Sequence, residues 1–191
     1  MTTPRIEPQE PPYAPELEEM LSKWMPPGAA MDPLRLFRTL GHNLPLAEAM
    51  RGVGSYMLGK RLSVSMKERE LVIDRVCARC NCEYEWGVHA AAFGAAAGLS
   101  QEEVEATVRA DGDDSVWGER EGLLIRLVDE LHDTSTVSNS LWSSLSKHYE
   151  PPQLLELLVL AGWYHIIAFV CNGTGVTLEE WAMRFPADGK P

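Results

Sequence analysis

The chain has 191 residues, 45% of them apolar, with 28 acidic against 17 basic residues and a formal net charge of -11. This length suits one domain, and the acidic balance without a Lys/Arg cluster argues against nucleic acid and anionic membranes as partners. No N-terminal apolar segment marks the chain for secretion, and four cysteines without a disulfide-rich composition fit a reducing cytosol. We therefore expect a cytoplasmic protein.

The first fifteen residues differ in composition from the rest of the chain. They contain five prolines among polar residues, which excludes a helix and predicts an extended or flexible arm over residues 1–15. Such an arm is suited to packing on a neighbouring subunit. Residues 16–191 show one helical signal after another and almost no alternating strand pattern, so we expect a single all-α domain.

Helix-start signals support the positions of the expected elements. Ser65, Ser100 and Thr177 are each followed three residues later by a glutamate, which is the pattern of a capping box. Pro33 and Pro45 suit the first turns of helices. The expected helices cover residues 16–25, 33–41, 45–59, 66–80, 82–97, 101–110, 117–133, 139–148 and 152–171, with a further turn or two from 178. The expected fold is an all-α, single-domain helical bundle.

The expected helix 152–171 is apolar almost all the way round, which is typical of a central helix. We interpret it as a core helix and not as a membrane span, because the apolar run also contains a histidine, an asparagine and three glycines. Its charged residue is Glu156, and a buried carboxylate needs a cation. Arg69 lies in the middle of the apolar stripe of the helix 66–80. We expect a buried Arg69–Glu156 pair; the alternative is that Arg69 extends to an interface.

Three cysteines lie within six residues, and Cys77-x-x-Cys80 has the spacing of zinc ligands. Both residues lie on the apolar stripe of one continuous helix, with no turn between them and no second ligand pair elsewhere in the sequence. We therefore interpret them as packing residues. Cys171, in the apolar helix near the C-terminus, has the same interpretation. No metal and no cofactor are expected.

Cys82 differs from these cysteines because a new helix is expected to begin at it. Asn81 tolerates the left-handed conformation that ends a helix, and a thiol at the next helix N-terminus is favoured as thiolate. The neighbouring Glu83 and Glu85 oppose that ionisation. Glu85 and His89 follow Cys82 at i+3 and i+7, which puts the three groups on one face of a helix.

Glu70 lies twelve residues before Cys82, at the edge of the apolar stripe of the preceding helix, from where it can reach Cys82 or His89. A partly buried carboxylate beside a histidine is a workable proton shuttle. With Trp86 and Phe93 on the flanks, these groups describe a small pocket with an apolar wall. The alternatives are a helix-start cysteine without chemistry and a solvated glutamate.

The stretch 62–93 resembles the carboxymuconolactone decarboxylase family, which includes the alkylhydroperoxidase D-like proteins. In the peroxidase branch a glutamate is followed after twelve residues by Cys-x-x-Cys, and a histidine comes four residues after the second cysteine. Glu70, Cys82 and His89 occupy the first, second and fourth of these positions. The resemblance extends more diffusely over about residues 30–180. It implies the all-α fold of these proteins and homo-oligomers with pockets close to subunit contacts.

The chain departs from this pattern at two positions. Glu85 stands where the second cysteine is expected, and Tyr84 stands where that branch has a relay histidine. A two-cysteine peroxidase needs one thiol to attack the peroxide and another to resolve the sulfenic acid, so Glu85 argues against that activity. We expect the catalytic residues to be Glu70, Cys82, Glu85 and His89, and the substrate-binding residues to be Tyr84, Trp86 and Phe93.

Three functions remain open at this point. The preferred one is lyase-type acid/base chemistry, similar to that of a carboxymuconolactone decarboxylase, on a small organic acid or lactone, because the histidine and the two glutamates supply proton donors and acceptors. The second is a one-cysteine peroxidase or thiol reductase that uses Cys82. The third is a non-catalytic oligomeric protein that binds a small molecule in the same pocket. The expected partners are a small-molecule substrate and further copies of the chain.

Overall fold

The computed structural model describes residues 3–25, 31–109 and 115–187. These residues form α-helices and no strand, which confirms the expected all-α class. The helices are α1 (Pro15–Trp24), α2 (Arg35–Leu40), α3 (Leu44–Met57), α4 (Met66–Arg79), α5 (Glu83–Phe93), α6 (Gln101–Ala106), α7 (Glu119–Thr134), α8 (Asn139–Leu145) and α9 (Pro151–Thr174).

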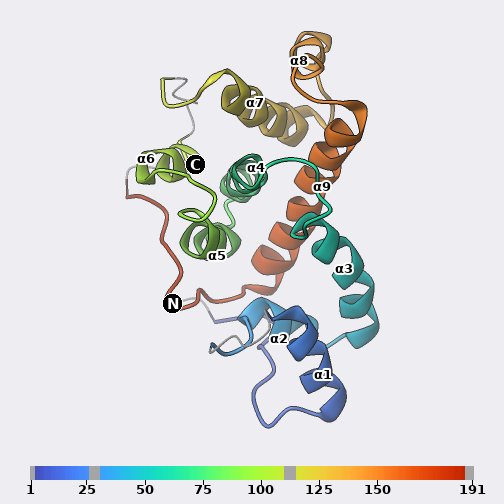
Figure 1. The fold of residues 1–191 in the computed structure, drawn as a ribbon. Coiled ribbons are helices and arrows are strands. Elements are labelled where there is room, and N and C mark those ends of the chain that lie inside the picture. Colours follow the sequence, from blue (N-terminus) through green and yellow to red (C-terminus); the bar gives the residue numbers. More distant parts are fainter. Residues whose placement is uncertain (1–2, 26–30, 110–114, 188–191) are drawn as a thin grey trace.

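α4 is the central helix of the bundle (Figure 1). It packs against α5, α7 and α9, and every residue from Arg69 to Ala78 is buried. A helix with one buried face leaves part of each turn exposed, so a continuous buried run means that α4 is covered on all sides. The charged residues within this run must therefore find partners inside the protein.

The sequence signals around α4 and α5 act as expected. Ser65 and Ser100 form capping boxes at the starts of α4 and α6. After α4, Asn81 has a φ of 49°, the left-handed conformation, and Cys82 is the N-cap of α5. This break reverses the chain, so that α5 packs back against α4 and brings the two motif-bearing helices together.

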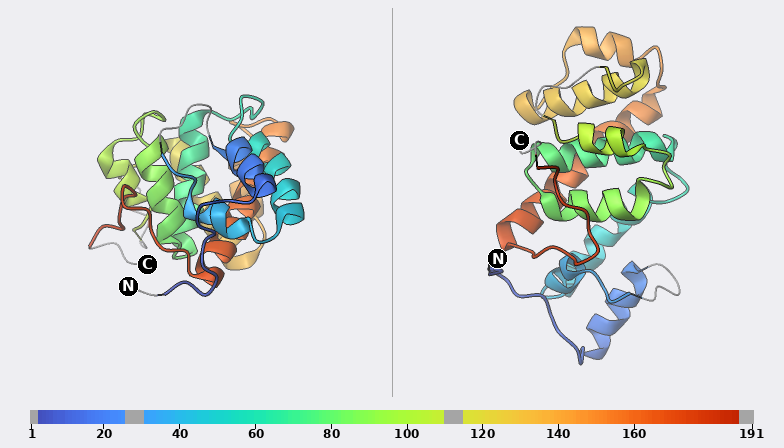
Figure 2. Two further views of the ribbon diagram at one scale, coloured as in Figure 1. Left: turned by 90° about the horizontal axis from the view of Figure 1, so that it is seen from below. Right: turned by 90° about the vertical axis from the view of Figure 1, so that its left-hand side faces the viewer.

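The C-terminal segment does not form the helical turns expected from residue 178. Beyond α9 the described residues, up to 187, contain turns near residues 180 and 187 but no helix, and Thr177 starts none. The segment crosses α5 instead, where the Met183 N–H donates to the Gly87 carbonyl oxygen at 3.1 Å (Figure 2). A Cβ at Gly87 would lie 2.2 Å from the Met183 carbonyl oxygen, so this close crossing requires glycine.

The proline-rich N-terminal segment has no helix before α1, and its described part packs on its own chain. The Arg5 N–H donates to the Thr174 carbonyl oxygen at the end of α9, at 2.7 Å. Arg38 Nη1 of α2 donates to the Gln9 carbonyl oxygen at 3.1 Å. The arm therefore joins α2 to the end of α9.

α9 is not buried all round, contrary to the expectation for residues 152–171. Its inner face packs against α4, but four large apolar side chains on it are between 47% and 66% exposed: Leu155, Val159, Ile166 and Phe169. Their spacing places them in one stripe, together with Gly162. α9 has the length and hydropathy of a membrane span, yet half of that window is buried in the protein, as in the core helix of a soluble fold.

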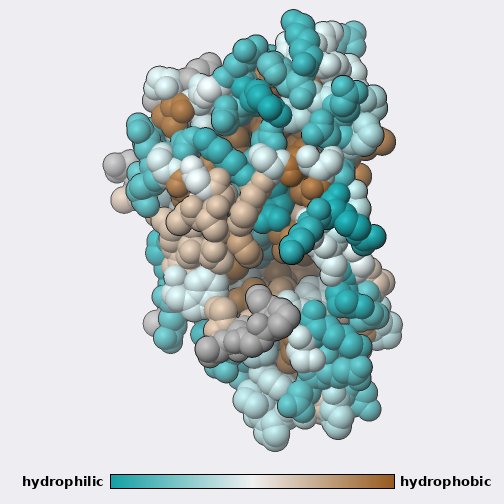
Figure 3. Space-filling model, in the orientation of Figure 1, coloured by the Kyte–Doolittle hydropathy of each residue, from teal (hydrophilic) through white to brown (hydrophobic). Residues whose placement is uncertain are grey.

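A second, weakly apolar surface lies over α5. In the view of Figure 3 most of the surface is hydrophilic, and this paler brown patch lies where Figure 1 shows α5. The exposed alanines at the end of α5 and just beyond it are Ala91, Ala92, Ala95 and Ala96. The stripe on α9 and this patch are two apolar areas of the described surface.

Candidate functional site

His89 of α5 is held between two carboxylates in the interior. Its Nδ1 lies 2.7 Å from Glu70 Oε2 of α4, and its Nε2 lies 3.4 Å from Glu85 Oε1, one turn earlier on α5. All three side chains are buried, Glu70 completely. The crossing of α4 and α5 therefore brings together three of the four expected catalytic residues.

The carboxylates determine the charge of this histidine. Burial favours the neutral imidazole, but Glu70 and Glu85 outweigh it and raise the pKa of His89 to about 10. Burial likewise raises the pKa of Glu70, but His89 and Arg69 more than offset this effect and hold it below its ordinary value. At neutral pH the pair is an ionised carboxylate hydrogen-bonded to an imidazolium that stores a proton.

Two aromatic rings enclose the imidazole. The Tyr164 hydroxyl of α9 lies 3.2 Å from His89 Nε2, with the two rings edge to face at 5.1 Å. The Phe93 ring centroid is also 5.1 Å from that of His89. Burial raises the pKa of Tyr164 well above its ordinary value, so its hydroxyl stays protonated. Tyr164 was not identified from the sequence, where it is one of many apolar or aromatic residues of a buried helix.

Asp74 is a second acid in this region that sequence analysis missed. It lies one turn beyond Glu70 on α4, is completely buried, and neither of its carboxyl oxygens has a hydrogen-bond partner among the described residues. Burial, and to a smaller extent the charges of Glu70 and Glu85, raise the pKa of Asp74 well above its ordinary value. Asp74 therefore keeps its proton to a higher pH than an ordinary aspartate, beside an ionised centre.

The expected Arg69–Glu156 pair is not formed. Arg69 Nη2 and Nε lie 2.6 and 2.7 Å from Glu70 Oε1. Glu156 accepts hydrogen bonds from the Tyr56 hydroxyl at 2.6 Å and from the backbone N–H and hydroxyl of Ser63 at 2.8 and 2.6 Å. The physical reason is burial: Glu70 has no access to water and needs the cation, whereas Glu156 is half-buried and neutral donors suffice.

Arg69 also connects this centre to the surface. It lines a pocket of about 240 Å³ whose other lining residues are Leu58, Gly59, Lys60, Leu62, Val64 and Met66. The pocket thus combines apolar walls with two cationic side chains, Arg69 and Lys60. A continuous chain of contacts runs from the pocket through Arg69 and Glu70 to His89.

Cys82 lies in the interior and not at a surface. It has no exposed area, and Cys171 of α9 is its close neighbour in the interior. The contact with Cys82 and burial raise the pKa of Cys171 well above its ordinary value. Burial does the same for Cys77, which adjoins them. The contact between Cys82 and Cys171 was not predicted, because no spacing rule joins residues so far apart in sequence.

Tyr84 and Trp86, two of the residues expected to bind substrate, hydrogen-bond to segments that pack against α5. The Tyr84 hydroxyl donates to Glu179 of the C-terminal segment at 2.7 Å. The Trp86 Nε1–H donates to the Thr107 hydroxyl at 2.9 Å, and the indole is fully buried. Both side chains hold neighbouring segments against α5, because successive residues of a helix point in different directions. Phe93 is the one of the three expected substrate-binding residues that packs on the imidazole.

Residues 45–122 match the carboxymuconolactone decarboxylase family, and this stretch contains α4 and α5. The fold is similar to a crystal structure of the alkylhydroperoxidase AhpD core, an uncharacterized peroxidase-related protein from Ralstonia eutropha. The TM-score is 0.77 at 14% identity, and the match covers 94% of this chain and 95% of that one. No curated protein matches the chain. The family match over residues 45–122 and the similarity of fold both support the resemblance seen in the sequence to the carboxymuconolactone decarboxylase and AhpD-like proteins.

Proposed function

We propose that the protein is a lyase-type enzyme that transfers a proton to a small organic acid or lactone through Glu70 and His89. The observation that carries this proposal is the double contact of Arg69, which is bonded to Glu70 and also lines the pocket with Lys60. Two cations in a small apolar pocket suit a substrate carboxylate. Because a guanidinium has five N–H donors, Arg69 can hold a substrate without releasing Glu70.

The proposed reaction begins with the substrate carboxylate bound at Arg69 and Lys60. The carboxylate leaves as CO₂, and the electron pair of the broken carbon–carbon bond stays on the substrate, conjugated with its carbonyl group. The proton of His89 Nδ1 then passes by way of Glu70 to the substrate carbon, a transfer that requires the substrate to enter beyond Arg69 because Glu70 is fully buried, and solvent reprotonates His89. Glu85 and Tyr164 hold the imidazole in place throughout.

A turnover experiment tests this proposal, with carboxymuconolactone and a panel of small unsaturated lactone acids as substrates. In D₂O the product should carry one deuterium on carbon and CO₂ should be released in equal amount. His89→Gln and Glu70→Gln should each lower kcat by at least about a hundredfold, whereas Cys82→Ser keeps most of it. Lys60→Met should raise KM with little change in kcat. Full activity of both proton-transfer variants would contradict the proposal.

A second candidate, thiol peroxidase chemistry, is favoured by the contact between Cys82 and Cys171. The Cys82 thiolate would attack a hydroperoxide to give a sulfenic acid and an alcohol, and Cys171 would then displace water to form a disulfide that an external dithiol reduces. The burial of both thiols opposes it. One equivalent of an organic hydroperoxide, followed by mass spectrometry of the thiols, separates the candidates. A Cys82–Cys171 disulfide that turns over with a dithiol would rank this reaction first.

We also propose that the protein is a homo-oligomer that associates through the apolar stripe of α9. The exposed side chains of that stripe surround Gly162, where a Cβ would meet no atom within 4 Å, so a second helix has room to approach. Phe169→Glu should then reduce the mass measured by light scattering. Trp142→Glu, an exposed aromatic residue of α8, is the control that should keep it. A Phe169→Glu variant with the wild-type mass would exclude this surface.

A further inference from the structure

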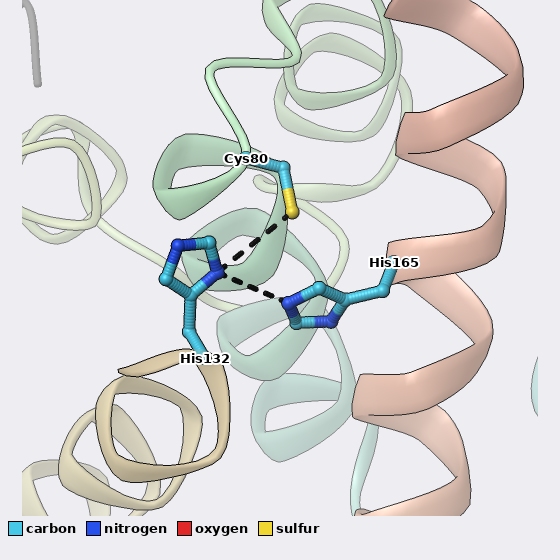
Figure 4. A group of neighbouring side chains, drawn as sticks. All are labelled: Cys80, His132 and His165. Carbon is cyan, nitrogen blue, oxygen red and sulfur yellow. Dashed lines mark hydrogen bonds between the residues drawn. The ribbon is translucent and has the colours of Figure 1, made fainter. Parts of the chain in front are cut away.

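Three side chains that commonly bind metals meet at the C-terminal end of α4. Cys80 follows α4, His132 belongs to the last turns of α7, and His165 lies on α9; all three point to one place (Figure 4). Cys80 Sγ lies 4.0 Å from His132 Nδ1, which lies 3.1 Å from His165 Nε2. The three ligand atoms all lie within 4.8 Å of one another.

These separations are close to those around a tetrahedral zinc ion. With Zn–N bonds of about 2.0–2.1 Å and a Zn–S bond of about 2.3 Å, ligand atoms lie about 3.3–3.6 Å apart. The observed 3.1 and 4.0 Å bracket that range, so side-chain shifts below about 1 Å would complete the geometry. No backbone rearrangement is needed.

The hydrogen bonds of His165 leave its Nε2 lone pair for a metal, whereas His132 Nδ1 donates to that nitrogen and gives up its hydrogen by a change of tautomer when an ion binds. His165 Nδ1 lies 2.8 Å from the Ala161 carbonyl oxygen, and because a carbonyl only accepts, Nδ1 carries the hydrogen and Nε2 keeps its lone pair. Such a bond to the second nitrogen is usual in metal-binding histidines.

Cys80 is fixed in position by a contact with α9. Its carbonyl oxygen accepts a hydrogen bond from Asn172 Nδ2 at 2.8 Å. The Cys80 thiol would bind an ion as thiolate and release its proton to solvent. Cys80, His132 and His165 are each only partly buried, which gives an ion access from solvent and leaves room for a water ligand.

We propose that Cys80, His132 and His165 form a binding site for a divalent transition-metal ion, with Zn²⁺ the ion that best suits one thiolate and two imidazoles. The position of Cys77 and Cys80 on one continuous helix argued against a zinc site built on that pair, and the site proposed here shares only Cys80 with it. An ion in this position would join α4, α7 and α9, the helices around the buried centre. It would therefore stabilise the fold.

The test uses the full chain, stripped with a chelator and titrated with Co²⁺ and then with Zn²⁺. We expect one ion per chain, the visible bands of tetrahedral cobalt and a near-ultraviolet thiolate-to-cobalt band, all displaced by Zn²⁺. Zn²⁺ should raise the Tm of the stripped protein. Cys80→Ser, His132→Gln and His165→Gln should each weaken binding at least about tenfold and abolish the rise in Tm.

Two controls keep the result specific. Cys82→Ser should bind cobalt with the thiolate band unchanged, and so should His148→Gln, which alters a histidine outside the cluster. Circular dichroism of each metal-free variant checks that it folds. If Cys80→Ser does not fold, the loss of metal binding is measured with His165→Gln instead. The proposal would be overturned by a stripped protein that binds no ion, by binding without the thiolate band, or by binding that Cys82→Ser removes.

Discussion

His89 of α5 and His132 of α7 belong to two clusters that lie at different points along α4. Their pKa values are shifted in opposite directions. His89 beside the first half of α4 is held by two carboxylates, which raise its pKa to about 10. His132 at the end of α4 faces a thiol and a second imidazole, and burial together with Arg79 and His165 lowers its pKa. The neighbouring groups therefore decide whether an imidazole stores a proton or offers a lone pair to a metal.

Burial separates the two clusters further. His89 is 3% exposed and Glu70 is fully buried, so their charges interact without screening by water. His132 and His165 are partly exposed, and no carboxylate hydrogen-bonds to either ring among the described residues. We expect mutations in the first cluster to change stability strongly, and mutations in the second to do so mainly when metal is present.

Removal of Glu70 should have the largest effect on stability. Glu70→Ala leaves Arg69 and His89 as buried cations without their carboxylate, which should cost about 3–5 kcal/mol. Denaturant unfolding at pH 7 measures the loss. The control is Glu48→Ala, which removes a surface partner of Arg51 and should change stability little. Equal losses in the two variants would mean that the Glu70 ion pairs are solvated.

The pH dependence of stability should report His89 and not His132. The folded-state pKa of His89 is about 10 against an ordinary 6.5, so the folded protein binds this proton more tightly. The resulting stability is fully present below pH 6.5 and is lost as the pH rises towards 10, by up to about 1.4 kcal/mol per pH unit.

Denaturant unfolding at several pH values from 6 to 10 checks this slope. His89→Gln should flatten the curve over the alkaline range, whereas His132→Gln should keep the wild-type slope, because the pKa of His132 is lowered and not raised. If the unfolding free energy of His89→Gln keeps the wild-type slope against pH, the proton responsible for that slope belongs to another group.

Asp74→Asn should stabilise the protein at neutral pH. The pKa of Asp74 is raised by burial, so the folded state holds a proton that the unfolded state releases above its ordinary pKa of 3.8. This costs stability that grows with pH, at about 1.4 kcal/mol per unit between the two pKa values. The gain from Asp74→Asn should therefore be larger at pH 7 than at pH 5, as measured by denaturant unfolding. A gain that does not change with pH would contradict a protonated Asp74.

Local sequence signals were sufficient for most of the fold. The capping boxes at Ser65 and Ser100 and the left-handed Asn81 depend on contacts within a few residues, and the structure contains all three. Thr177 has the same capping pattern but starts no helix, because the segment after it is held in an extended path across α5. Tertiary packing there overrides a local preference.

The site was only partly predictable from the sequence, because part of it is formed by tertiary contacts between distant helices. Helical spacing placed Glu85 and His89 on one face, but it could not identify Tyr164 or Cys171, which reach the site from α9. The exposed stripe of α9 was missed because composition alone does not distinguish a buried apolar face from an unpartnered one. Arg69 was assigned the wrong carboxylate, since sequence periodicity gives the direction of a side chain and not its partner.

The smallest effect is expected for His165→Gln in metal-free protein, and it sharpens the contrast between the clusters. His165 is partly exposed, and its hydrogen bonds to the Ala161 carbonyl and to His132 Nδ1 join neutral groups, so their loss should cost about 0.5–1.5 kcal/mol for each bond. With Zn²⁺ present the wild type gains stability as RT ln(1 + [Zn²⁺]/Kd), and the variant forfeits that gain. The difference between the two proteins should therefore grow with zinc concentration, by about 1.4 kcal/mol per tenfold increase above the Kd. The stability difference between the wild type and His89→Gln should not depend on zinc concentration. His89 is bonded to two carboxylates and is not a ligand of the proposed metal site.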